Sequence, residues 1–340
     1  MLPSRRALLA LTPASIGLSQ VQILDDSVPS RQDTGQNYPG LEAEIRRAFE
    51  DLPDRKSFKI WAPRSGGRPE FTAELHANEQ FFSASSNKAY ILCERLRQLE
   101  SPNLEEKLID HKLKLDEGIW SLGSPVFDPP NLTGLVSERT TMEAMITHSD
   151  NTATDMILKE ATAEKVRRFI AAIGAKNTLI PDSTRALAGY LFGASNYKTI
   201  TWEELMAAAG PLVHPALNDV ETLASSASDF VSFYARALQG RFFKDRQTLR
   251  QFRRILLLGD ITNLVPFPLG PNVFGKAGYF DIDGQHARCI AGGMHFSGRW
   301  AYFAMIINWN APEANDPETV KAYFRATRTA IDLVLQALSD

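Results

Sequence analysis

The sequence predicts an α/β (α+β) protein of two intertwined subdomains, and three observations support this prediction. Segments that alternate apolar and polar residues, as strands do, lie near both ends of the chain. The segments between them repeat apolar residues at a spacing of about 3.6, as helices do. At 340 residues the chain is long enough for a full hydrophobic core. We therefore expect an α/β part at 41–84 and 226–340, with an all-α part at 85–225 inserted into it.

The folded body is expected to begin near Leu41, where LEAEIRRAFEDL has helical spacing. KSFKIWAP and EFTAELHANEQFF read as two strands around a turn at Ser65-Gly66-Gly67, so a hairpin follows this helix. Six helices are predicted in the middle of the chain: KAYILCERLRQL, TTMEAMI, TATDMILKEA, AEKVRRFIAAIG, TWEELMAAAGPLV and ASDFVSFYARALQG.

Three more strands are predicted near the end of the chain: PNVFGKAGYFDI, ARCIAGGMHF and WAYFAMIINW. Turns at Asp283-Gly284 and Ser297-Gly298 separate them. PETVKAYFRATRTAIDLVLQAL has the pattern of a last helix. The sequence contains no repeat, so we expect 41–340 to form one domain.

The N-terminus resembles an export signal. Arg5 and Arg6 precede an apolar run that reaches about Leu18, which is typical of a secretory or twin-arginine leader. We expect a signal peptide at 1–24, a polar linker at 25–40, and a periplasmic or secreted protein; the alternative is a frayed, weakly apolar N-terminal tail. Elsewhere no apolar run approaches the roughly 18 residues of a membrane span.

Composition excludes several classes of function. The net charge of −3 gives no basic surplus for nucleic acid or an anionic membrane. The six histidines never stand at the spacing of zinc ligands, so we expect no metal and no other cofactor. Cys93 and Cys289 are far apart in sequence, and both a disulfide and two separate thiols stay open. We expect a monomer.

Ser85 and Lys88 belong to the first of three short motifs, at the junction of a predicted strand and a predicted helix. Residues three apart on a helix share a face, so the Lys88 amine can approach the Ser85 hydroxyl. A serine becomes a strong nucleophile when a base removes its proton, and burial can lower the pKa of a lysine enough to make it that base. The Ser85 backbone N–H at the helix N-terminus would supply half of an oxyanion hole. Taken alone, the motif is more typical of a capping serine and a solvated lysine.

The second motif, Ser149-Asp150-Asn151, lies in a short loop between two predicted helices. A hydroxyl and a carboxamide two residues apart can face one cleft, where the hydroxyl passes a proton to a leaving nitrogen and the amide holds a substrate carbonyl. Asp150 is expected to fix the loop by accepting hydrogen bonds from backbone N–H groups. Alone, this motif is typical of a helix cap.

The third motif, Lys276-Ala277-Gly278, lies on a predicted strand. Lys276 would present a positive charge to a substrate carboxylate, and Gly278 would let substrate approach the backbone closely. The stretch from Gly270 to Lys276 also matches the start of a phosphate-binding P-loop. Ala277 replaces the Ser or Thr that a P-loop requires, and a strand rather than a helix follows, so nucleotide binding is excluded.

Together, FFSASSNKAYIL, MITHSDNTATDMIL and GKAG resemble the class A β-lactamases and their relatives among the penicillin-binding proteins. The resemblance extends from Leu41 to the C-terminus. It implies a β-lactamase/DD-peptidase-like fold, with a five-stranded antiparallel sheet flanked by helices and an inserted all-α subdomain.

The resemblance also implies a role for each residue of the motifs. Ser85 would be the acylated nucleophile and Lys88 its base. Ser149 would pass the proton to the leaving nitrogen, Asn151 would position the substrate amide, and Lys276 would anchor a carboxylate.

Gly278 would line the substrate-binding strand, and the backbone N–H of Tyr279 would complete the oxyanion hole. Two departures from the family pattern matter. Ala277 stands where the family carries a hydroxyl. One hydrogen bond to the substrate carboxylate, worth about 1.5 to 3 kcal/mol, is therefore missing. The family also carries a glutamate, roughly three dozen residues after the second motif, that activates the deacylating water.

In that region this chain reads NTLIPDSTRALAGYLFGASNYKT, in which Asp182 is the only carboxylate. Loss of a general base costs about 10² to 10⁴ in rate, so such an enzyme is expected to acylate and then stall. A shift of deacylation to Lys88 or Asp182 would restore hydrolysis.

The leading hypothesis is a β-lactamase-like serine hydrolase. It would form an acyl-enzyme through Ser85 on a β-lactam or another carboxylate-bearing amide or ester, that is, on a small-molecule or peptidoglycan-like substrate. The alternatives are a D-Ala-D-Ala peptidase-like enzyme, an acylase or esterase, and an acyl sensor that binds without turnover.

Overall fold

The computed structural model describes residues 39–339 apart from Asp54 and Pro266. The predicted signal peptide at 1–24 and the predicted linker up to residue 38 lie outside the described residues. Helix α1 (Pro39–Ala48) begins two residues before Leu41, the predicted start of the folded body. Proline is favourable in a first helical turn, because its missing N–H has no helical partner there.

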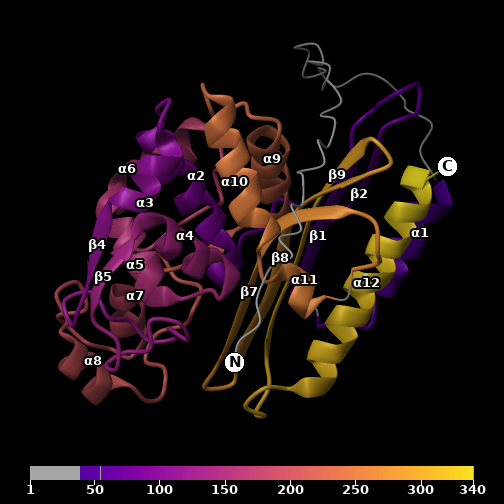
Figure 1. Cartoon of the computed structure of the whole chain (residues 1–340). Helices are drawn as coiled ribbons and strands as arrows, with labels where there is room; N and C mark the ends of the chain where they lie inside the picture. Colours follow the sequence, from indigo (N-terminus) through magenta and orange to yellow (C-terminus); the bar gives the residue numbers. More distant parts are fainter. Residues whose placement is uncertain (1–38, 54, 266, 340) are drawn as a thin grey trace, which may run out of the picture. The chain divides into compact units, whose positions relative to one another are not determined.

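The centre of the fold is a five-stranded antiparallel sheet in the order β2-β1-β9-β8-β7 (Figure 1). Its strands are β1 (Lys56–Ala62), β2 (Phe71–Leu75), β7 (Asn272–Ile282), β8 (Gln285–Phe296) and β9 (Arg299–Asn310). Since β1 pairs with β9, strands from both ends of the chain meet in one sheet. The predicted fold class is confirmed.

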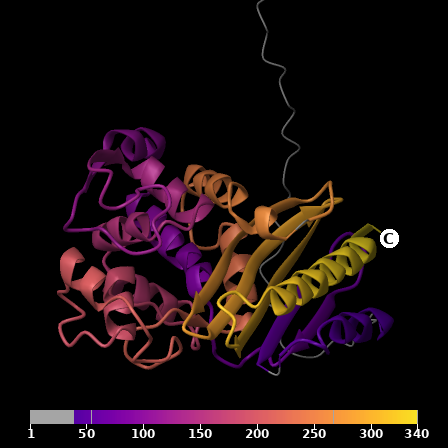
Figure 2. The same cartoon turned by 90° about the horizontal axis from the view of Figure 1, so that it is seen from below.

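Helices α1 and α12 (Pro317–Ser339) cover one face of this sheet, with the short helix α11 (Ile261–Leu264) beside them (Figures 1 and 2). Apolar side chains from every second residue of the strands meet them in one buried cluster that includes Ala277 and Ile290. In a strand, alternate side chains point to opposite faces, so Lys276 and Gly278 point away from α12.

The other face of the sheet packs against α9 (Ala227–Leu238) and, through it, against the helical part of the molecule (Figure 1). This part contains α2 (Lys88–Leu99), α3 (Leu104–Asp110), α4 (Glu138–Thr147), α5 (Asn151–Ala161), α6 (Ala163–Ala172), α7 (Thr184–Leu191), α8 (Trp202–Ala208) and α10 (Arg246–Leu257). Cys93 in α2 and Cys289 in β8 are buried free thiols.

Region 85–225 was expected to be all-α, but it also contains short strands. β4 (Lys112–Leu115) pairs with β5 (Gly134–Ser137), and β6 (Ala224–Ser225) pairs with β3 (Phe81–Phe82). Strands of two to four residues are too short to show a period of two in the sequence. Across residues 39–53, 55–265 and 267–339, no helix is both long and apolar enough to cross a membrane.

Candidate active site

Ser85 lies in a tight turn between β3 and α2. The turn is a single 3₁₀ segment, η1 (Ala84–Asn87), and its first residue has φ +46°, a left-handed conformation that is costly for an alanine. The Ser83 hydroxyl donates to Asn87 Oδ1 over 2.7 Å and holds the turn closed. The Ser85 side chain is only partly buried. Among the described residues its hydroxyl has no hydrogen-bond partner, so it is free to react.

Lys88 is the first residue of α2, and its side chain is fully buried. Its Nζ donates to the Ser149 carbonyl oxygen over 2.6 Å, to Ser149 Oγ over 3.2 Å and to Asn151 Oδ1 over 2.7 Å. The helical spacing predicted an approach of Lys88 to Ser85, whereas the hydrogen bonds of Lys88 run to the second motif. All three acceptors are uncharged oxygens.

This environment favours the neutral amine of Lys88. Burial holds its pKa well below the ordinary value, and the positive charge of Lys276 lowers it further. The carboxylates of Asp150, Asp260 and Asp155 act in the opposite direction but do not outweigh burial. Lys88 can therefore accept a proton, as a general base must.

The second motif forms the turn between α4 and α5. Asp150 caps α5: its Oδ1 accepts a hydrogen bond from the Ala153 N–H over 2.8 Å, and its Oδ2 accepts others from the N–H groups of Val126 and Phe127. The prediction that Asp150 fixes the loop is confirmed. Ser149 has φ +57°, a strained conformation that this cap stabilises.

The two ends of the Asn151 carboxamide are both engaged. Oδ1 accepts the hydrogen bond from Lys88, and Nδ2 donates to the Leu122 carbonyl oxygen over 2.7 Å. Gly123 packs so closely that a Cβ there would lie 2.9 Å from Asn151 Nδ2. Asn151 is thus oriented with its oxygen toward the amine of Lys88, and its predicted contact with a substrate amide stays a prediction.

The third motif meets the first through the backbone of β7. A Cβ on Gly278 would lie 2.4 Å from the Ser83 carbonyl oxygen and 2.9 Å from the Ser85 nitrogen. Only glycine allows this approach, because the backbone of η1 cannot move as a side chain can. The Ser86 hydroxyl also donates to the Lys276 carbonyl oxygen over 3.2 Å. The sheet edge therefore lies directly against the turn that carries Ser85.

Lys276 is fully buried and is paired with Asp260, a residue that the sequence did not predict. Its Nζ donates to Asp260 Oδ2 and, over 2.8 Å, to the Ala277 carbonyl oxygen. Asp260 Oδ1 accepts a hydrogen bond from the Ala277 N–H over 3.0 Å. Burial lowers the pKa of Lys276, and the charge and hydrogen bond of Asp260 oppose that shift. Nothing in LLLGDITNL distinguishes this aspartate from an ordinary helix cap.

The backbone N–H of Tyr279 points to the open edge of the sheet. β7 is an edge strand, and N–H groups two residues apart point the same way. Since the Ala277 N–H donates to Asp260 rather than to β8, the Tyr279 N–H also points outward. The predicted oxyanion hole of Ser85 and Tyr279 fits this direction and stays a prediction.

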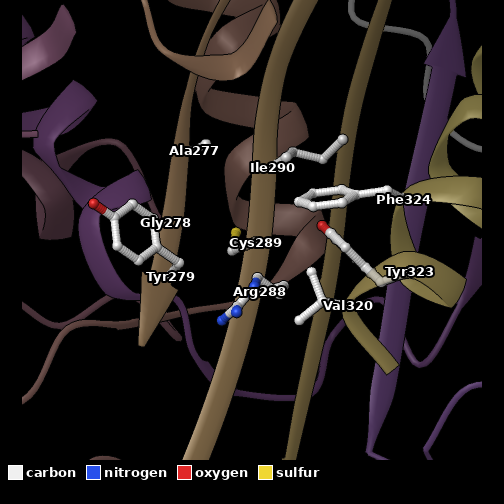
Figure 3. A pocket seen from close by; sticks show the side chains of 9 residues that line it. All are labelled: Ala277, Gly278, Tyr279, Arg288, Cys289, Ile290, Val320, Tyr323 and Phe324. Carbon is white, nitrogen blue, oxygen red and sulfur yellow. The ribbon is translucent and has the colours of Figure 1, made fainter. Parts of the chain in front are cut away.

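A cavity of about 210 Å³ lies on the opposite side of β7, between the sheet and α12. Figure 3 shows Tyr323 and Phe324 of α12 pointing toward β8. These two residues line the cavity together with Ala277, Gly278, Tyr279, Arg288, Cys289, Ile290 and Val320. The cavity shares two residues with the predicted site, but neither Ser85 nor Lys88 lines it. It is therefore a neighbour of the site and not its reaction chamber.

The segment expected to hold a deacylating base includes α7, and Asp155 of α5 binds the N-terminus of this helix. The Asp155 carboxylate accepts hydrogen bonds from the N–H groups of Thr184 over 2.6 Å and Arg185 over 3.0 Å. The Thr184 hydroxyl donates to the Asn151 carbonyl oxygen over 3.2 Å. Burial raises the pKa of Asp155 to about 6. A hydroxyl of this segment, rather than a carboxylate, therefore contacts the second motif.

Asp182, the carboxylate of that segment, faces other partners. Its Oδ1 accepts a hydrogen bond from Arg167 over 2.7 Å, and Lys198 lies 3.5 Å from its Oδ2. Partial burial works to raise the pKa of Asp182, but the hydrogen bond and charge of Arg167, with the charge of Lys198, hold it below the usual range. Asp182 is a weak base here, which disfavours the predicted rescue of hydrolysis by this residue.

Known sequences and structures include proteins that are similar to this chain. A sequence model described as the β-lactamase enzyme family matches residues 40–334. No curated protein matches the chain.

Solved structures share the fold. A β-lactamase from Chitinophaga pinensis superposes with a TM-score of 0.67 at 14% identity, covering 88% of this chain and 99% of its own. A class A β-lactamase from Mycobacterium abscessus gives 0.63 at 17%, covering 88% and 100%. A mutant of PBP-A, solved as an acyl-enzyme complex with penicillin G, gives 0.64 at 17%, covering 89% and 98%.

Proposed function

The chain belongs to the β-lactamase enzyme family, a group of serine hydrolases, and from that premise we propose that it forms an acyl-enzyme through Ser85. The acyl donor is a β-lactam or another amide or ester, a small-molecule or peptidoglycan-like substrate. A β-lactamase-like hydrolase is the reading that the geometry supports best.

One observation carries the proposal: among the described residues, a buried lysine without a carboxylate partner stands one helical turn from a serine whose hydroxyl has no hydrogen-bond partner. Lys88 is surrounded by neutral oxygens and has a strongly lowered pKa. Ser85 stands three residues earlier on a strained turn. A lysine that only stabilised the fold would be expected to have a counter-ion, because a buried unpaired charge is costly.

The chemistry follows from these contacts. As Ser85 Oγ bonds to the substrate carbonyl carbon, its proton passes to Lys88 Nζ. The hydrogen bond between Lys88 and Ser149 Oγ then provides a route to the leaving nitrogen or oxygen, whose bond to the carbonyl carbon breaks. The N–H groups of Ser85 and Tyr279 would stabilise the negative oxygen of the tetrahedral intermediate.

A second candidate, an acyl sensor that binds without turnover, rests on the contact between Thr184 and the second motif. A hydroxyl at that place cannot take a proton from water as a carboxylate can, so the acyl-enzyme is expected to be long-lived. A D-Ala-D-Ala peptidase-like enzyme and an acylase or esterase would use the same acylation step. Export to the periplasm or medium, and action as a monomer, complete the proposal.

Covalent labelling with a fluorescent penicillin tests the proposal. The wild type should take up one label, Ser85→Ala should take up none, and Ser86→Ala should keep it, because the adjacent Ser86 hydroxyl is buried against β7. Equal labelling of Ser85→Ala and the wild type would contradict the proposed nucleophile.

Intact mass spectrometry after a short pulse then measures how long the adduct lasts. Persistence for minutes supports the sensor or a slow hydrolase. Loss within seconds, with fast turnover of nitrocefin, would identify an efficient β-lactamase and contradict the sensor.

A further inference from the structure

We infer that Asp260 determines the substrate class of this site: by occupying Lys276, it selects acyl donors that carry no carboxylate at that end. This inference rests on the proposed acylation of Ser85. It differs from the prediction made from the sequence, in which Lys276 anchors a substrate carboxylate.

The contacts of Asp260 are those that a bound carboxylate would make. One oxygen accepts a hydrogen bond from the Lys276 ammonium, and the other accepts one from the Ala277 N–H over 3.0 Å. Together they bind the lysine of the third motif and a backbone donor on the open edge of β7. Asp260 therefore acts as an internal ligand.

The pair is secluded from solvent. The Lys276 side chain is fully buried, and the Asp260 side chain is 12% exposed. Two of the three ammonium protons are committed, one to Asp260 and one to the Ala277 carbonyl oxygen. In such surroundings an ion pair is little screened, so opening it to admit another anion is unfavourable.

The part of β7 that carries Lys276 packs against the turn of the proposed nucleophile. The Lys276 carbonyl oxygen accepts the Ser86 hydroxyl, and Gly278 packs on the Ser85 nitrogen. The charge of Lys276 is close enough to lower the pKa of Lys88. A substrate held against this part of β7 would meet the field of Asp260 together with that of Lys276.

A second cation on the sheet, Arg288, is also paired with a carboxylate. Arg288, which stands opposite Tyr279 in the register of β7 and β8, donates through both terminal nitrogens to Asp281, over 3.0 Å and 2.8 Å. Ala277 adds no hydroxyl. A substrate carboxylate would have to share Lys276 with Asp260 and would be repelled by it.

The test compares penicillin G with its methyl ester, which differ only in the carboxylate. Intact mass spectrometry gives the second-order rate constant for acylation of Ser85 by each compound. We expect the wild type to react with the ester at least as fast as with the acid. In Asp260→Asn the acid-to-ester ratio of rate constants should rise tenfold or more.

Two further variants isolate the cause. Asp260→Asn with Lys276→Met removes both charges and should return the ratio to the wild-type value. Glu164→Gln removes one negative charge from an exposed residue of α6 and should leave the ratio unchanged. Because only the ratio is compared, a general loss of activity or stability in a variant does not imitate the expected result.

The outcomes separate the two proposals. A wild type that prefers the acid more than tenfold, or an Asp260→Asn ratio within twofold of the wild type, would overturn the inference alone. Failure of both compounds to label wild-type Ser85 would overturn the proposed function and this inference with it. If Asp260→Asn does not fold, the wild-type ratio still decides.

Discussion

Two buried lysines belong to the motifs that meet at the turn of Ser85, and their surroundings differ in one respect. Within the described part of the chain, Lys88 donates only to neutral oxygens of the Ser149–Asn151 turn. Lys276 is equally buried but has the carboxylate of Asp260 as its partner. Burial lowers the pKa of both, and at Lys276 the aspartate opposes the shift.

This difference separates two roles that a lysine can have in one site. Without a counter-ion, an amine can lose its proton and serve as a base. With a counter-ion, it remains a cation whose charge is already balanced. On the proposed function, we therefore expect Lys88 to supply the reactive amine and Lys276 to order the backbone of β7.

The largest effect is expected from removing the proposed base, Lys88. Lys88→Met should slow acylation by about 10² to 10⁴, because no other amine contacts Ser149 among the described residues. Binding before acylation should change little, since the hydrocarbon part of the side chain is kept. Stopped-flow labelling over a range of penicillin concentrations separates the dissociation constant of the non-covalent complex from the rate constant of acylation.

Lys165→Met is the matched control, because Lys165 is an exposed residue of α6. It should acylate at the wild-type rate. An unchanged rate in Lys88→Met would remove this lysine from the mechanism and with it the contrast between the two regions.

Lys276→Met should mainly cost stability. It leaves the buried carboxylate of Asp260 without its partner, which typically costs about 3 to 5 kcal/mol. Urea unfolding measures the loss as the difference in the free energy of unfolding between the variant and the wild type.

Lys88→Met serves as the comparison in the same assay. Because no carboxylate of the residues that the structure describes pairs with Lys88, its replacement should leave the free energy of unfolding unchanged or raise it. Equal destabilisation by both substitutions would show that the two lysines do not differ in the way described.

The sheet and the parts of the site that are local in sequence could be predicted. The strands β7, β8 and β9 are long enough for their hydrophobic pattern to be recognised, and tight turns at Asp283 and Ser297 separate them. Asp150 could be predicted as a loop-fixing cap because one of its oxygens caps the helix that begins at the next residue; the contacts of its other oxygen with Val126 and Phe127 could not be predicted. Such features depend on residues a few positions apart.

The features that were missed depend on distant segments. Asp260 meets Lys276 because the turn at Gly259 packs on β7, where a Cβ would lie 2.3 Å from the Gly275 carbonyl oxygen. Asp155 meets Thr184 across the gap between two helices. Neither contact leaves a pattern in the sequence. Lys88 was expected to approach Ser85, but the hydrogen bonds that its amine donates run to Ser149 and Asn151, some sixty residues away.

Asn151→Asp would make the surroundings of Lys88 resemble those of Lys276. A carboxylate at the place of Oδ1, 2.7 Å from Nζ, should raise the pKa of Lys88, because its negative charge stabilises the ammonium form. Since the neutral amine is the base, acylation at neutral pH should fall roughly tenfold for each unit, and it should recover as the pH is raised through the new pKa. The rate of labelling by a neutral ester, followed from neutral to alkaline pH, measures the shift in the pKa of Lys88.

Asn103→Asp is the control, because Asn103 is the exposed N-cap of α3, where aspartate is equally suitable. A pH profile that does not move would mean that the charge state of Lys88 does not limit acylation, and the absence of a carboxylate beside it would then have no catalytic meaning.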